Sequence, residues 1–143
     1  MRGLKWFIAG TLAVPLAHQV MLAILNAAGV IDRAPFPMDA TKPFGVPAVV
    51  SLSFWGGVWG VILLLVVGRL RGAKFWIVTL IFGALAPTLV AGFVVAPLKG
   101  QAAGGNAKMA LVGLLVNGAW AIGTALIARG LEAWRATSRN SPA

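Results

Sequence analysis

The chain has 143 residues, of which 59% are hydrophobic, 10% are charged and none is cysteine. Because soluble domains carry about 25% charged residues, this composition excludes an ordinary water-soluble domain, and the lack of cysteine excludes disulfides and thiol redox chemistry. The formal net charge of +9 does not indicate nucleic acid as a partner, since the basic residues lie between or beside long apolar segments.

Four apolar segments are each long enough to cross a hydrocarbon core about 30 Å thick. They run over residues 6–30, 48–67, 75–98 and 109–128. The first is longer than the apolar region of a cleaved secretory signal, which has about 7–15 residues, so we expect it to be retained. The sequence therefore predicts one all-α domain over residues 1–143, an integral membrane four-helix bundle.

The distribution of basic residues predicts the orientation of these helices. Eight Lys and Arg residues lie at the two ends of the chain and in the short loop between the second and third segments, against four in the other two loops. Because cytoplasmic loops carry an excess of Lys and Arg, we expect both the N-terminus and the C-terminus to be cytoplasmic. The chain would then be a multi-pass protein of the bacterial inner (plasma) membrane, with the lipid bilayer as its first partner.

The two outer loops differ in composition. The loop over residues 31–47 contains Pro35, Pro37, Pro43 and Pro47. These exclude a continuous helix and predict a stiff, extended cap on the outer face. The loop over residues 99–108 is rich in glycine and alanine, which predicts a flexible connector.

Three polar side chains fall near the middle of the apolar segments, His18 and Gln19 in the first and Asn117 in the fourth. The midpoints of the four segments place His18 and Asn117 at the same depth as Gly57 and Pro87. Because an unpaired polar group in hydrocarbon costs several kcal/mol, these side chains should face other helices or a wet cavity. We therefore expect a midplane polar site formed by His18, Gln19 and Asn117.

Small residues on the second segment predict a helix-packing face. Gly56, Gly57 and Gly60 lie on one side of this helix, and the spacing of Gly56 and Gly60 allows another backbone to approach closely. That backbone could belong to the same chain or to a second copy.

Proline interrupts two of the predicted helices. Pro15 lies in the first segment and Pro87 in the third. Each lacks the N–H that would bond to the carbonyl four residues earlier, so we expect kinks at both positions.

His18 is the only histidine, and its role is open between one structural and three functional interpretations. As a structural residue it would hydrogen-bond with Asn117 or Gln19 across the bundle and fix the helix register. As a haem ligand it would need a second axial ligand from another chain. As a proton carrier it would act alone, since all three carboxylates of the chain lie outside the spans. As a contact for a bound ligand it would share the site with Gln19 and Asn117.

The sequence lacks the components of a recognisable catalytic site. It has no cysteine nucleophile, no paired carboxylates in the spans and no second histidine, so we expect no catalytic residues, no metal ligands, no cofactor and a non-enzymatic protein. The favoured interpretation is a protein that acts through helix association, as an accessory or assembly subunit of a membrane complex or as a homo-oligomer. Its partners would be other membrane subunits or itself. The alternative is a small transporter or channel that binds its solute at the midplane site around His18 and Asn117.

Overall fold

The computed structural model describes residues 1–42 and 44–139, with side chains described as far as residue 134. Pro43 of the predicted outer cap, the basic side chains of Arg135 and Arg139, and the tail from residue 140 onward lie outside the described part. The chain is all-helical apart from a two-stranded hairpin in the first connecting loop.

The helices form four long rods, two of which contain π-helical turns. In chain order the elements are α1 (Arg2–Ala13), η1 (Val14–His18), α2 (Gln19–Ala27), β1 (Ala40–Thr41), β2 (Val46–Pro47), α3 (Ala48–Val67), α4 (Gly72–Val90), η2 (Ala91–Val95), α5 (Ala96–Leu98) and α6 (Ala107–Arg139). Joined where they are continuous, four helices are long and apolar enough to cross a membrane: Arg2–Ala27, Ala48–Val67, Gly72–Leu98 and Ala107–Trp134.

The helix Ala48–Val67 has the same bounds as the second predicted apolar segment, and the other three helices have bounds that differ from the predicted ones. The third rod begins at Gly72 and the fourth at Ala107, each earlier than predicted, and α6 continues beyond residue 128 to Arg139. The first rod ends at Ala27 rather than at residue 30, because Gly29 adopts a φ of 68°. The N–H of Gly29 bonds to the carbonyl of Asn26 and that of the next residue to Leu25, which is the Schellman pattern that ends a helix.

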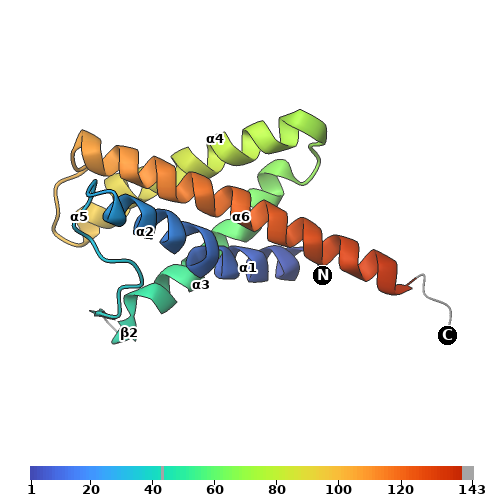
Figure 1. The fold of residues 1–143 in the computed structure, drawn as a ribbon, viewed down its shortest axis with the longest axis horizontal. Coiled ribbons are helices and arrows are strands. Elements are labelled where there is room, and N and C mark those ends of the chain that lie inside the picture. Colours follow the sequence, from blue (N-terminus) through green and yellow to red (C-terminus); the bar gives the residue numbers. More distant parts are fainter. Residues whose placement is uncertain (43, 140–143) are drawn as a thin grey trace.

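The rods are arranged so that the first and fourth lie at the centre (Figure 1). α1 packs on both α3 and α6, and α6 also packs on α4, so α3 and α4 flank this central pair. α3 and α4 are joined by a short loop and diverge from it. Trp59 of α3 contacts Phe82 of α4, with a ring-centroid distance of 6.4 Å. α3 makes no comparable contact with η2 or α5, so the outer halves of the two flanking rods are separated.

Both described ends of the chain lie at the same end of the bundle. The Glu132 carboxylate accepts hydrogen bonds from Arg2 Nε at 3.1 Å and from the indole of the buried Trp6 at 3.3 Å. Lys5 Nζ donates to the carbonyl of Leu131 at 2.8 Å. These contacts clamp the start of α1 to the end of α6, as an even number of spans requires.

Glycines allow the central helices to approach closely. A Cβ on Gly10 would collide with the backbone of Gly56, and one on Gly60 would collide with the carbonyl of Trp6. Gly57 lies against the side chains of Phe7 and Thr11. The predicted packing face on α3 is therefore occupied by α1 of the same chain.

The two prolines occupy different local structures. Pro15 lies in the first turn of η1, so the missing N–H coincides with a change from α-helical to π-helical bonding. Pro87 lies inside α4, which continues to Val90 before η2 begins at Ala91.

The first outer loop is non-helical, as predicted, and folds over the end of the bundle. The paired strands β1 and β2 form its tip. The first free N–H groups of α3, those of Ala48 and Val49, bond to the carbonyls of Asp39 and Pro37 at 2.9 Å each. The loop thus provides the cap of the helix that follows it.

We predict that Gly60→Ala is strongly destabilising, because the new Cβ would overlap backbone atoms of α1 that cannot move independently. Over-packing of this kind costs about 1–3 kcal/mol. The matched control is Gly130→Ala, since that glycine lies on an exposed part of α6 and a Cβ added there would have no atom within 4 Å. The control should be neutral or gain up to about 1 kcal/mol in helix propensity. Thermal unfolding in detergent measures both, and equal midpoints would contradict the close approach.

Candidate functional site

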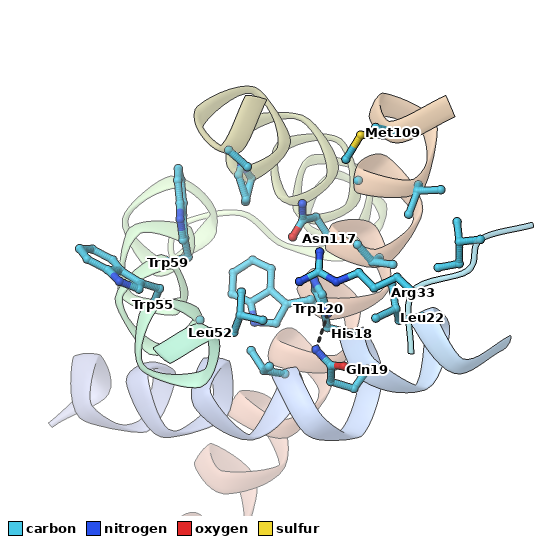
Figure 2. A pocket seen from close by; sticks show the side chains of 18 of the residues that line it. His18, Gln19, Leu22, Arg33, Leu52, Trp55, Trp59, Met109, Asn117 and Trp120 are labelled. Carbon is cyan, nitrogen blue, oxygen red and sulfur yellow. Dashed lines mark hydrogen bonds between the residues drawn. The ribbon is translucent and has the colours of Figure 1, made fainter. Parts of the chain in front are cut away.

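A cavity of about 540 Å³ lies between the four rods, reaching from the middle of the bundle toward the outer loops (Figure 2). Its volume is within the range of about 300–1,000 Å³ that is usual for small-molecule sites. Every long rod contributes to its wall, and so does the segment that follows α2. Its polar wall contains His18, Gln19, Asp32, Arg33, Lys108 and Asn117.

Gln19 connects the first rod to the outer loop. Its side chain is completely buried, and its Oε1 accepts a hydrogen bond from the N–H of Phe36 at 2.7 Å. Phe36 has a φ of 53°, a left-handed conformation that is uncommon for a residue other than glycine. The amide of Gln19 therefore holds a strained loop residue in place, and with it the chain between residues 31 and 36.

His18 has its hydrogen-bond partner within the same helix. Its Nδ1 lies 3.4 Å from Nε2 of Gln19. The Phe36 bond identifies the other atom of that amide as the oxygen, so the group facing Nδ1 is the NH₂ donor. The ring nitrogen Nδ1 then accepts, and the ring proton is on Nε2.

Asn117 connects α6 to α4. Its Nδ2 donates to the hydroxyl of Thr88 at 2.9 Å. This bond joins two rods, and its acceptor is a threonine. The described residues contain no hydrogen bond between Asn117 and His18; of the two partners expected for His18, Gln19 is the one in contact with it.

Arg33 enters the cavity from the loop. Figure 2 shows its side chain extended across the cavity, with the guanidinium toward Asn117 and His18. Within the described part of the chain, it forms no ion pair and no hydrogen bond. Sequence reasoning treated Arg33 only as a loop charge, and its proximity to Gly29 and to the end of the first span was the one available signal.

The remaining wall is apolar and rich in tryptophan. Trp55 and Trp59 approach from α3 and Trp120 from α6 (Figure 2). Trp120 is buried, and its indole N–H donates to the carbonyl of Gly10 at 3.0 Å. Sequence analysis placed no tryptophan in the site, although Trp120 is one helical turn from Asn117.

The exposed lining residues form two groups. Asp32, Arg33, Lys108 and Met109 are at the end of the bundle that carries the first and third loops. Trp55 on α3 and Ala91 on the third rod line the cavity on two rods that separate toward that end. Exposed residues therefore line the cavity both at its loop end and on these two helices.

The predicted site residues are divided between this cavity and the helix contacts. His18, Gln19 and Asn117 all line it, as do Gly56 and Pro87. The lining residues do not include Gly57, Gly60 or Pro15. Among the described residues, no group of three or more His, Cys, Asp or Glu side chains is placed to hold a metal ion. The site offers hydrogen-bond donors and acceptors, one guanidinium and aromatic faces.

No family model, no curated protein and no solved structure matches this chain.

We predict that Gln19→Leu releases the outer loop. The substitution keeps the side chain similar in size but removes the acceptor of the Phe36 N–H, and an unsatisfied buried group costs about 1–3 kcal/mol. Hydrogen exchange of peptides covering residues 31–41 should become faster in detergent. The control is Gln101→Leu, which changes an exposed glutamine in the other outer loop and should leave this exchange unchanged. Equal protection in the wild type and Gln19→Leu would contradict the anchoring role.

Proposed function

We propose that this protein is a non-enzymatic, multi-pass protein of the bacterial inner membrane that binds a small amphipathic molecule in the cavity between its four helices. This is the transporter or channel alternative of the sequence analysis, with the solute now described by the chemistry of its site. The observation that carries the proposal is the mixed lining of the cavity. Charged and amide side chains share its wall with three tryptophans and aliphatic residues.

The openings of the cavity support a ligand that has both polar and apolar parts. A wholly water-soluble molecule would need no opening between helices, and a wholly apolar one would make no use of the charged and polar side chains that line the cavity. The gap between α3 and η2 gives access from the lipid, and the mouth near Arg33 and Lys108 gives access from the outer aqueous side. A molecule that partitions into the bilayer could enter sideways and place its polar group toward the loops.

Helix association was the other function expected from the sequence. The glycine face on which it could rest is covered by α1 within the same chain, so association would have to use a different surface. The cavity has a defined volume and a defined set of polar groups, and it therefore supports ligand binding better.

The proposed orientation has both termini in the cytoplasm and the cavity mouth on the opposite side. The clamp between Arg2 and Glu132 supports an arrangement with both ends on one side, and the excess of basic residues at that end supports the cytoplasmic assignment. Fusions of a reporter that fluoresces only in the cytoplasm should be bright at either terminus and dark when inserted after Ala103. Dark fusions at both termini would reverse the orientation.

Binding can be measured through the tryptophans that line the cavity. We expect single-chain amphiphiles brominated along the chain to quench the fluorescence of the purified protein saturably in detergent, because bromine would lie close to Trp55, Trp59 and Trp120. Ala91→Phe should remove the saturable part, since this exposed alanine lines the lateral opening and a phenyl ring would fill it.

The matched control is Ala73→Phe, which changes an exposed alanine on the same rod, away from the cavity. It should bind as the wild type does. Quenching that rises without saturation, or that is the same in Ala91→Phe, would show that the probe reaches only the lipid-facing tryptophans and would refute the proposed function.

A further inference from the structure

The polar part of the cavity wall has an excess of positive charge. Three charged side chains line the cavity, the acidic Asp32 and the basic Arg33 and Lys108. No ion pair joins any two of them in the described part of the chain. Figure 2 shows the side chain of Arg33 reaching across the cavity.

The uncharged groups beside Arg33 add a further donor. Because Nδ1 of His18 faces the NH₂ group of Gln19, the ring carries its proton on Nε2 and donates from there. The oxygen of Gln19 is occupied by the N–H of Phe36 and is not available to a ligand. Arg33 itself provides five N–H donors and no acceptor. The oxygen of Asn117 and the carboxylate of Asp32 are acceptors in the lining, against this larger set of donors.

Arg33 is exposed at the mouth of the cavity and forms no ion pair in the described part of the chain, so an anionic group that enters there meets an unpaired guanidinium. Carboxylate and phosphate groups match the planar guanidinium with two parallel hydrogen bonds. We propose that the ligand of this cavity is an anionic amphiphile whose carboxylate or phosphate head group pairs with Arg33 and whose apolar part lies against the tryptophan wall. This inference rests on the proposed function and specifies its ligand.

The geometry also gives the direction in which such a ligand lies. Arg33 is held near the outer loops by the Gln19–Phe36 bond, whereas Trp55 and Ala91 mark the lateral opening toward lipid. The head group is therefore at the loop end, and the apolar chain extends toward the gap between α3 and η2.

The test compares two brominated probes of equal chain length, a carboxylic acid and the corresponding alcohol, at pH 8 where the free acid is ionised. In the wild type the acid should bind more tightly than the alcohol. Arg33→Gln should weaken binding of the acid by about tenfold or more, since a charge-assisted bidentate pair is lost, and should change binding of the alcohol by less than about twofold. Lys42→Gln removes a positive charge from the same loop at an exposed position outside the cavity and should change neither.

Failure of this inference is distinguishable from failure of the proposed function. Equal affinity for acid and alcohol in the wild type, or unchanged affinity for the acid in Arg33→Gln, overturns the anionic ligand while leaving the cavity as a binding site. Absence of saturable quenching by both probes refutes the proposed function as well. If Arg33→Gln binds neither the acid nor the alcohol, Arg33→Lys is measured next. A preference of Arg33→Lys for the acid supports a requirement for positive charge, and the lack of such a preference overturns it.

The anionic head group could belong to a membrane lipid or to a free single-chain acid, and competition separates these sources. Displacement of the brominated acid by a short-chain phosphatidylglycerol identifies a lipid phosphate, whereas displacement by the unbrominated fatty acid alone identifies a free acid. If phosphatidylcholine displaces the brominated acid as effectively as phosphatidylglycerol or the fatty acid does, the requirement for a net negative charge is overturned.

Discussion

The absence of a side chain at Gly10 determines how the central helices meet. The bare backbone of Gly10 lies against Gly56 and Gly60 of α3, and its carbonyl accepts the indole N–H of Trp120 from α6. One residue thus contacts both neighbours of α1, one through close approach and the other through a hydrogen bond. Apolar side chains have no hydrophobic reason to associate in lipid, so contacts between backbones and hydrogen bonds between helices are what hold such a bundle together.

This central contact also explains why a cavity exists. α1 lies between α3 and α6, and α6 lies between α1 and α4. The flanking helices α3 and α4 therefore have few contacts with each other, and these include the Trp59–Phe82 contact. Toward the outer face they separate, and the space between them is enclosed by large side chains on one side and by the folded loop on the other. The cavity is a consequence of the order in which the helices pack.

The rods, the outer cap and the depth of the polar residues could be predicted because they depend on local properties of the sequence. Hydropathy determines the number of spans, and the prolines of the first loop exclude a helix there. His18, Gln19 and Asn117 line one cavity, in agreement with their shared depth. Their hydrogen-bond partners could not be predicted, because Thr88 and the N–H of Phe36 reach them only through the tertiary arrangement. The same is true of Gly10, which as a single glycine in the sequence shows no sign of being the partner of the α3 face.

Arg33 was missed because it lies in a loop, outside the apolar segments in which a polar site was expected. An arginine at the centre of a span would cost about 2.5–3.5 kcal/mol on insertion, and sequence reasoning therefore searches the spans for charges and finds none. Here the guanidinium comes from a loop that turns back after Gly29 and is fastened by the buried Gln19, and Arg33 stays exposed while it lines the cavity. The uncharged Gln19 holds the loop through its hydrogen bond to Phe36, and the loop carries the charged Arg33. A buried glutamine that bonds to the backbone of a following loop is therefore a reason to search that loop, as well as the span, for the residues that meet a ligand.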